Sequence, residues 1–346
     1  MVGDRRTLFT CNDGTVHSLA SVIPVAGIGR FEAEVFGTME SSEVAAVLAS
    51  LAATATGVEV VGGLWYCSST AAVAGVVLED GRSVVVRAYQ RSASSSFIEG
   101  VVRAQDRLAS AGFPCARPLS GPVVVDGILG RVESLLPDPG PRRFEPGEMN
   151  ESARGLARVV SLAATVDPAG LDRHPMALPD TQLYPSPHSP LFDFDATASG
   201  AEWIDEIASA ARRAMTDVTP VIAHGDWSAR NVRLGPGGLL GAYDWESLQH
   251  GPETTAVGVA AATWRSLGEP HEPMAPSADE IMRYVTLYEA GREGPFTARQ
   301  RRSARAAAAF ALAYTARCEH ALDPGTRTGR ASERLATDDH MQPLLE

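Results

Sequence analysis

Three polar residues that could bind a metal ion and accept a proton follow two short apolar segments. Asp226 and Asn231 come after residues 221–223, and Asp244 comes after residues 239–243. A hairpin of these two segments would bring the three side chains to one edge. Two carboxylates and an amide oxygen at one edge suit a hard, oxygen-seeking cation such as Mg²⁺.

Phosphoryl transfer needs the same set of groups. One carboxylate accepts the proton of the attacking hydroxyl, and oxygen ligands hold the metal ions that neutralise the phosphates. His224, Asp226 and Asn231 have the spacing H-x-D-x₄-N of the protein-kinase catalytic loop. We therefore predict Asp226 as the catalytic base, Asn231 and Asp244 as metal ligands, and His224 as a residue that holds the loop in shape. The alternative is a set of ordinary polar turns, because so short a pattern also arises by chance.

The N-terminal half predicts a small antiparallel sheet with one inserted helix. Asp-Gly pairs at 80–81 and 126–127 indicate two hairpins. A helix is expected at 39–56, followed by three strands, an amphipathic helix and two further strands: residues 58–64, 71–78, 83–89, 97–111, 123–125 and 128–134.

The C-terminal half predicts mainly alanine-rich helices. Residues 137–147 are dense in Pro and Gly and indicate a linker or surface loop. Helices are expected at residues 148–166, 201–216, 278–291 and 297–322. The sequence therefore predicts an α+β fold in which a small antiparallel β lobe, residues 1–133, precedes a larger helical catalytic and substrate lobe, residues 134–346.

The stretch HGDWSARNVR followed by AYDWES resembles the motif of the aminoglycoside phosphotransferase and choline-kinase superfamily. Lobe order and helix placement extend the resemblance from about residue 39 onward, although only residues 219–247 are specific. The resemblance implies a protein-kinase-like bilobal fold, a nucleotide-binding first lobe, and transfer of the γ-phosphate of ATP, or of GTP in some members, to a hydroxyl of a small molecule.

The resemblance also implies a phosphate-binding side chain on the third strand. That position holds Arg87, and an Arg fork can pair with phosphate where related proteins use Lys. Glu99, in the following helix, is the candidate to orient Arg87. The alternative for this pair is an exposed surface ion pair.

Two further nucleotide contacts are implied. Ser68, Ser69 and Thr70 occupy the place of the phosphate-covering loop, without its glycines. The segment 133–136, with Glu133 and Leu135, would supply the backbone that meets the purine edge. The alternative for this segment is an ordinary strand end.

Composition excludes several classes of enzyme and of binding partner. The 346 residues are 45% hydrophobic and contain no lysine, which excludes a lysine nucleophile and a lysine-bearing P-loop. A net charge of −12 disfavours nucleic acid and anionic membranes as partners. The polar N-terminus and four scattered cysteines predict a cytoplasmic protein with reduced thiols. We expect a monomer or a homodimer.

The acceptor is not named by the sequence. The leading prediction is an O-phosphotransferase acting on an aminoglycoside-like antibiotic, and the alternatives are a kinase of a sugar, choline or amino alcohol, a non-catalytic pseudokinase, or a kinase of protein side chains. The helical lobe would attract a cationic acceptor through its acidic residues, and the alternative is a neutral, sugar-like acceptor. These acidic residues are Asp193, Asp195, Glu202, Asp205, Glu206, Glu253 and Glu289.

Overall fold

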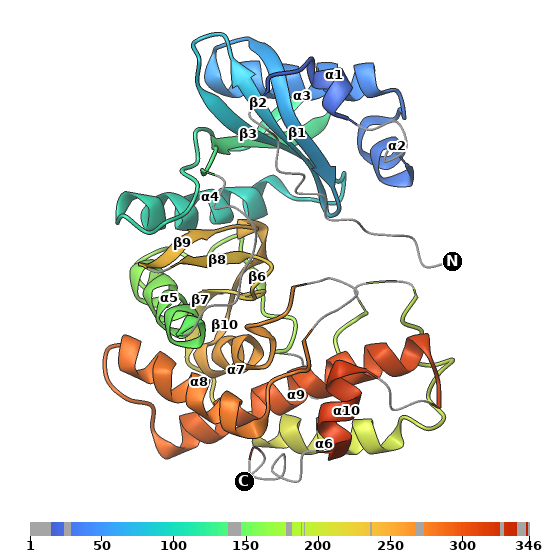
Figure 1. Ribbon diagram of the computed structural model, residues 1–346, viewed down its shortest axis with the longest axis vertical. Coiled ribbons are helices and arrows are strands. Elements are labelled where there is room, and N and C mark those ends of the chain that lie inside the picture. Colours follow the sequence, from blue (N-terminus) through green and yellow to red (C-terminus); the bar gives the residue numbers. More distant parts are fainter. Residues whose placement is uncertain are drawn as a thin grey trace. The chain divides into compact units, whose positions relative to one another are not determined.

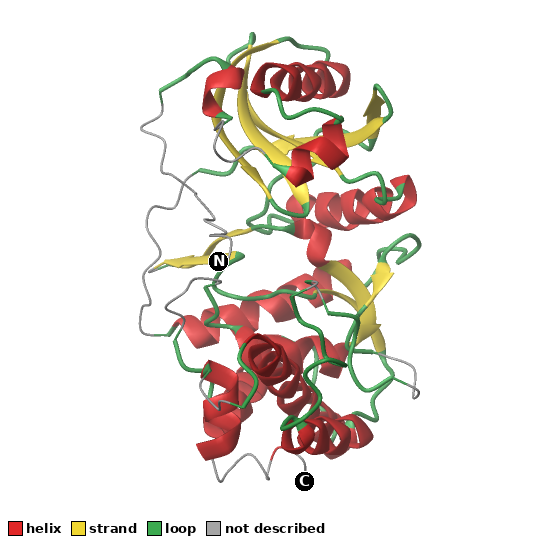
Figure 2. Ribbon diagram, turned by 90° about the vertical axis from the view of Figure 1, so that its right-hand side faces the viewer, coloured by secondary structure: helices red, strands yellow, loops and turns green. Residues whose placement is uncertain are grey.

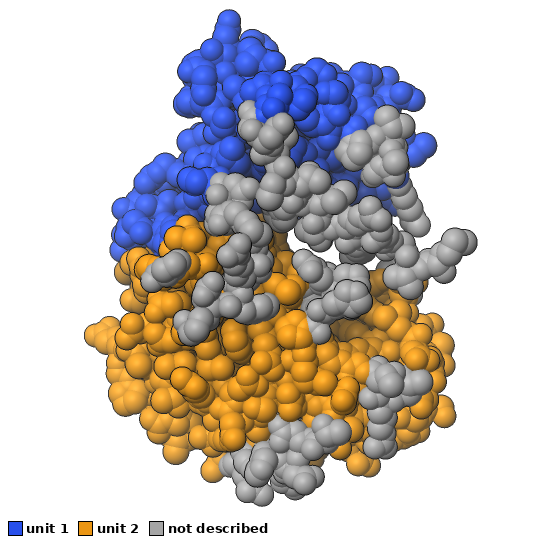
Figure 3. Space-filling view, viewed as in Figure 1, with its two compact units in different colours: residues 1–141 blue, residues 142–346 orange. Residues whose placement is uncertain are grey.

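The structure is a computed structural model that divides into two compact units, Met1–Pro141 and Arg142–Glu346 (Figure 3). The described residues are 15–23, 29–137, 147–177, 182–187, 189, 191–235, 237–267, 273–325, 329–337 and 344. The division falls after Pro141, whereas we expected it after residue 133. Most of the predicted linker at 137–147 lies outside the described residues, as does Cys11.

The first unit is built on one antiparallel five-stranded sheet of order β1-β2-β3-β5-β4 (Figure 1). Its strands are β1 (Val60–Ser68), β2 (Ala71–Leu78), β3 (Ser83–Tyr89), β4 (Val123–Val125) and β5 (Ile128–Ser134). Asp126 and Gly127 both have positive φ, as a tight Asp-Gly hairpin turn requires. The strand and hairpin predictions for this half are therefore confirmed, with β1 shifted to a later start and end.

Helices cover both faces of this sheet. The helices of the unit are α1 (Leu19–Val22), α2 (Arg30–Phe36), α3 (Ser41–Thr56) and α4 (Ser95–Ser110). Leu48 and Leu51 of α3 pack on one face with Val76 and Val86, all of them fully buried. Ile98 of α4 belongs to a second cluster on the opposite face. The Ser94 side chain caps α4 by accepting from the Phe97 N–H at 3.1 Å.

The second unit is mainly helical (Figure 2). Its helices are α5 (Glu148–Ala163), α6 (Glu202–Ala214), α7 (Glu253–Thr263), α8 (Ala278–Gly291), α9 (Ala298–Leu322) and α10 (Arg330–Thr337). Capping boxes start α8 at Ser277 and α9 at Thr297. Gly258 of α7 lies against the α9 backbone, because an added Cβ would meet the Ala304 carbonyl oxygen at 2.3 Å. None of the helices in the described part of the chain is long and apolar enough to cross a bilayer.

Two small sheets in the second unit flank the predicted site. The three-stranded sheet has the order β6-β10-β7, and the two-stranded sheet pairs β8 with β9. The strands are β6 (Asp172–Arg173), β7 (Pro220–His224), β8 (Val232–Gly235), β9 (Gly238–Ala242) and β10 (Leu248–Pro252). The expected hairpin between residues 221–223 and 239–243 is therefore wrong. Each of these segments instead takes a partner that the sequence did not reveal as a strand.

Candidate active site

The loop between β7 and β8 carries Asp226 and Asn231, and hydrogen bonds to its main chain fix its shape. The Asn231 side-chain amide nitrogen, Nδ2, donates to the Asp226 carbonyl oxygen at 3.0 Å. The Asn231 carbonyl accepts from the Tyr243 N–H at 2.9 Å, which places the end of β9 beside the loop. Asp244 is the next residue along the chain. The structure therefore brings Asp226, Asn231 and Asp244 together, through pairings other than the predicted hairpin.

The His224 ring connects this loop to the end of β9. Its ring accepts the Asp226 N–H at Nδ1 at 3.2 Å, so Nε2 is the ring nitrogen that donates to the Tyr243 carbonyl at 2.9 Å. Trp227 and Trp245 pack edge-on against the ring, each with a centroid distance of 5.6 Å. All three side chains are buried. This geometry supports a shaping role for His224 and a packing role for the two tryptophans.

The segment after α7 holds the other side of the loop. The Ala229 and Arg230 N–H groups donate to the carbonyls of Trp264 and Ser266 at 2.8 and 3.0 Å. The Arg233 guanidinium donates to the Ala229 and Arg230 carbonyls at 2.9 and 3.0 Å. The backbone of the loop is thus fixed by neighbours on two sides.

The Asp226 carboxylate is 30% exposed and contacts two side chains of its own loop. Ser228 donates to one oxygen at 3.0 Å, and Arg230 forms an ion pair with the other. Burial alone would raise the pKa of Asp226, but the Arg230 guanidinium, together with the Ser228 hydroxyl, outweighs burial and lowers that pKa below its usual value. Asp226 is therefore ionised and able to accept a proton at neutral pH.

Ser228 and Arg230 were missed at the sequence level. Their positions, two and four residues after Asp226, are the signal that could have identified them, because a tight loop turns such side chains back toward its first carboxylate.

Asn231 and Asp244 fit a small metal site that completes its coordination from a bound ligand. Asp244 is in the left-handed conformation, with φ 58°, and Ser247 donates to one carboxylate oxygen at 2.9 Å. Because the Asn231 amide nitrogen is used within the loop, its oxygen is the atom left for a cation. Among the described residues, no three or more His, Cys, Asp or Glu side chains are grouped so that they could hold a metal ion by themselves. Mg²⁺ commonly takes one or two carboxylates and draws its other ligands from water and substrate phosphates, so this donor set fits it.

In the first unit, the partner of Arg87 differs from the expected one. The Arg87 guanidinium contacts Glu133 Oε1 through Nε and one terminal nitrogen, both at 3.0 Å. Glu99 is exposed on α4 and accepts from the Ser95 hydroxyl at 3.0 Å. The prediction that Glu99 orients Arg87 is therefore corrected. The carboxylate comes from the neighbouring strand because the registers of β3 and β5 place it on the same face.

The purine-edge segment is corrected in part. Glu133 lies inside β5, where it pairs with Val85 on one side and with Pro118 on the other. Its backbone is therefore enclosed by the sheet and not available to a purine. Leu135 lies just beyond the strand and stays a predicted contact.

The β1–β2 turn carries the predicted phosphate-covering residues. Ser68 ends β1, and Ser69 and Thr70 are exposed in the turn. The Ser69 N–H donates to the Ala71 carbonyl at 3.1 Å, so this N–H is used within the turn. Phosphate binding here would rest on the hydroxyl groups, and these three residues stay predictions.

Several acidic residues expected to attract a cation are already paired. Glu253 is buried and binds Arg292 at 2.9 Å through both oxygens, and Tyr288 also donates to it. Glu289 pairs with Arg301 at 2.8 Å. These contacts join helices of the second unit, so they reduce the charge that an acceptor would meet. They also show Glu253 acting as a link from α7 to α8.

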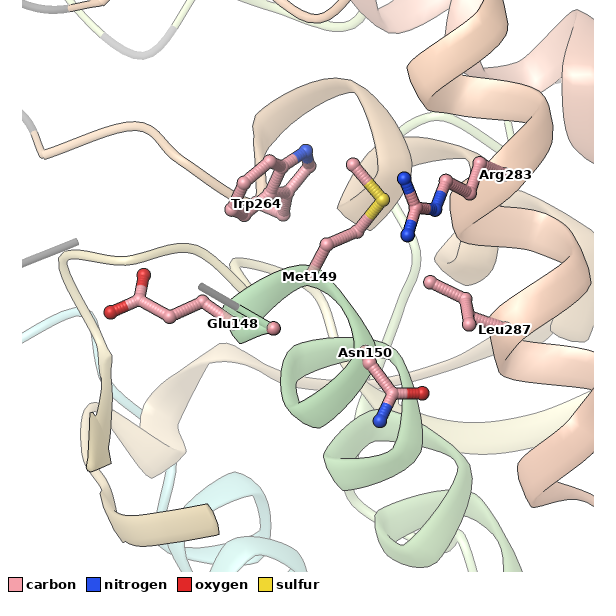
Figure 4. Close-up of a pocket in the computed structure, with 7 residues that line it drawn as sticks. Glu148, Met149, Asn150, Trp264, Arg283 and Leu287 are labelled. Carbon is pink, nitrogen blue, oxygen red and sulfur yellow. The ribbon is translucent and has the colours of Figure 1, made fainter. Parts of the chain in front are cut away.

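A pocket of about 220 Å³ lies at the start of α5, and none of the three central site residues lines it (Figure 4). Met149 lies between the Trp264 ring and the Arg283 guanidinium, while the Glu148 side chain points away from them. Trp264, which lines this pocket, accepts the Ala229 N–H of the loop with its carbonyl. The pocket therefore adjoins the loop but is not lined by Asp226, Asn231 or Asp244.

Comparison with known proteins identifies a family and a shared fold. A model of the phosphotransferase enzyme family matches residues 74–293. An amicoumacin kinase, solved with AMP-PNP, Ca²⁺ and amicoumacin, has 14% identity and a TM-score of 0.53, with 81% of this chain and 86% of that chain covered. A spectinomycin phosphotransferase has 12% identity and a TM-score of 0.49, with 86% and 93% covered. No match was found among curated proteins.

The structure has the protein-kinase-like α+β architecture, as predicted, and the family model identifies a phosphotransferase. The chain belongs to the phosphotransferase enzyme family, whose model spans more than half of its length, and is a small-molecule phosphotransferase.

Proposed function

We propose that this enzyme transfers the γ-phosphate of ATP to a hydroxyl group of a small molecule. The observation that carries the proposal is the loop in which the Asn231 side-chain amide donates to the Asp226 carbonyl, while the Asn231 carbonyl accepts from the Tyr243 N–H beside Asp244. Asp226, ionised beside Arg230, would accept the proton of the attacking hydroxyl. The amicoumacin kinase, which shares the fold, was solved with an ATP analogue and a small-molecule ligand, and this supports the proposal.

Asn231 and Asp244 would hold Mg²⁺. When bound, this ion would neutralise charge on the phosphates during transfer. Ser247 would fix the orientation of the Asp244 carboxylate, and His224 would keep the loop in register with β9. In the first unit, Arg87 would bind nucleotide phosphate as a fork donor.

An antibiotic is the acceptor class that we propose to test first, with a sugar or amino alcohol as the alternative. The full chain would be incubated with Mg²⁺ and ATP and separate acceptors: hygromycin B, spectinomycin, amicoumacin, a macrolide, a fructosamine and choline. Mass spectrometry would detect phosphorylated acceptor, and a parallel reaction with EDTA would test metal dependence.

A product bearing one phosphate, formed only with Mg²⁺, supports the proposal and identifies the acceptor class. A chain that binds Mg·ATP but transfers phosphate to no acceptor, and not to water, contradicts transfer and favours the pseudokinase alternative.

A further inference from the structure

A buried polar cluster lies beside Arg87, on the face of the five-stranded sheet that packs against α4. We call it the Arg87 cluster, and it consists of Arg87, Tyr89, Gln105, Arg131 and Glu133. Glu133 is at its centre. One oxygen, Oε1, accepts from Arg87 at 3.0 Å, and the other, Oε2, accepts from Gln105 at 2.8 Å and from Arg131 at 3.1 Å.

The register of the sheet explains why a carboxylate is needed at this position. Arg87 of β3 lies directly opposite Arg131 of β5, and like charges in that arrangement repel. Glu133 is two residues along β5 from Arg131, so its side chain is on the same face. It contacts both guanidinium groups, which relieves their repulsion and gives Arg87 a fixed partner within its own sheet.

Gln105 is the contribution of α4 to the cluster. Its Oε1 accepts from Arg131 at 2.7 Å, and its Nε2 donates to the Ala116 carbonyl and to Glu133, both at 2.8 Å. Arg131 also donates to the Tyr89 hydroxyl at 2.7 Å. The helix therefore contacts the cluster through a neutral amide, whereas the charged contact of Arg87 comes from β5.

Exposure changes along the cluster in one direction. The Arg131 side chain is 0% exposed, Glu133 is 4% exposed and Arg87 is 12% exposed. Arg87 is thus the cationic member nearest to solvent, where an anion can reach it, and the other members form its support. An arginine fork held in one geometry loses less conformational entropy when it binds phosphate.

We propose that Glu133 is the positioning residue for Arg87, so that the grip on nucleotide phosphate is set by the β3–β5 sheet and not by a carboxylate on α4. The inference rests on the proposed function, because it takes Arg87 as the phosphate-binding side chain. It predicts that Glu133, and not Glu99, controls affinity for the triphosphate.

The experiment compares two probes, Mg·ATP and adenosine, on the full-length chain. Calorimetry would give the Kd of Mg·ATP, and ligand-detected NMR would give that of adenosine. We expect Glu133→Gln to raise the Kd of Mg·ATP tenfold or more and to leave that of adenosine within twofold. Glu99→Gln is the matched control, since it makes the same chemical change at an exposed carboxylate, and it should leave both constants within twofold.

Glu133→Asp is the second variant, because Glu133→Gln could unfold the unit by leaving two buried guanidinium groups without their carboxylate. The shorter side chain keeps the charge but moves it away from Arg87. We expect a higher Kd for Mg·ATP and a melting temperature near that of the wild type.

Unchanged Mg·ATP affinity in a folded Glu133 variant would overturn the inference. A loss of Mg·ATP affinity in Glu99→Gln as large as that in Glu133→Gln would also overturn it. Equal loss of ATP and adenosine affinity would also overturn it, since that result indicates a merely structural role. Failure of the proposed function looks different: the wild type would bind Mg·ATP in preference to adenosine and yet phosphorylate no acceptor.

Discussion

Asp226→Asn separates catalysis from folding in this enzyme. Asparagine keeps the shape of the side chain and removes the charge that accepts a proton. The bonds that shape the loop involve the Asp226 main chain, namely its N–H to His224 and its carbonyl to Asn231, so the substitution leaves them in place. What is lost is the ion pair with Arg230.

The structure sets the size of both effects. The Asp226 and Arg230 side chains are 30% and 47% exposed, so solvent screens their attraction, and such pairs contribute about 0.2–1 kcal/mol to stability. A loss of that size lowers the melting temperature by no more than roughly 4 °C in a protein of this size. General-base assistance contributes about 10²- to 10⁴-fold, or roughly 3–5 kcal/mol of the barrier. The loss of activity therefore far exceeds the loss of stability.

The assay is ADP release at saturating Mg·ATP and saturating acceptor, with the melting temperature measured on the same preparation. Asp106→Asn is the matched control, because Asp106 forms an exposed ion pair with Arg117 at 3.2 Å, in the first unit. It should keep normal turnover. Turnover of a folded Asp226→Asn protein within tenfold of the wild type would refute the assignment of Asp226 as the base.

Further predictions concern the site, its pH dependence and the packing of α7 on α9. Arg230→Gln removes the cation that lowers the pKa of Asp226, so the acid limb of the pH–rate profile should move to higher pH; an unmoved limb would contradict the pairing. The same lowered pKa means that the Asp226–Arg230 pair stabilises the fold above the pKa of an unfolded aspartate, and that this stability is lost as the pH falls through the folded-state value. Asp244→Ala should abolish Mg²⁺-dependent ATP binding in calorimetry, and Asn231→Ala should weaken it less, because Asn231 is a neutral ligand; unchanged affinity in Asp244→Ala would exclude the metal role. Gly258→Ala should gain about 1 kcal/mol in helix propensity but lose about 1–3 kcal/mol, because the added Cβ would overlap the Ala304 carbonyl oxygen. Urea unfolding should therefore show a lower free energy of unfolding, and a more stable variant would disprove the close contact. Raising the ionic strength should raise the KM of a cationic acceptor, whereas a KM that ignores salt would count against steering by charge.

Local signals predicted the first unit well from residue 39 onward, but α1 and α2 were not predicted. The β-branched strands and the two Asp-Gly turns act between neighbouring segments, so their pairing follows from the order of the chain. Helices α8 and α9 were also predicted closely from their alanine-rich composition, and the structure shows a capping box at each start. Such features lie within a few residues of one another, and a sequence shows them directly.

Pairing between distant segments was not predictable in the same way. The partner of β7 is β10, which holds His250 and Gly251 and has no β-branched residue to mark it. Helix α7 was missed because nearly all of its residues are buried, so it lacks the polar face that gives an amphipathic pattern. The Arg87–Glu133 pair was missed because it depends on the register between β3 and β5.

The main-chain anchoring of the catalytic loop has a consequence for how this enzyme can change. Neighbouring strands and the segment after α7 hold the loop through backbone groups, which every amino acid other than proline provides. The exposed Arg230 side chain can therefore be exchanged without loss of the loop's course, whereas Ser228 is buried and more constrained. A substitution at position 230 can thus change the pKa of Asp226 while the backbone that carries Asp226 stays in place.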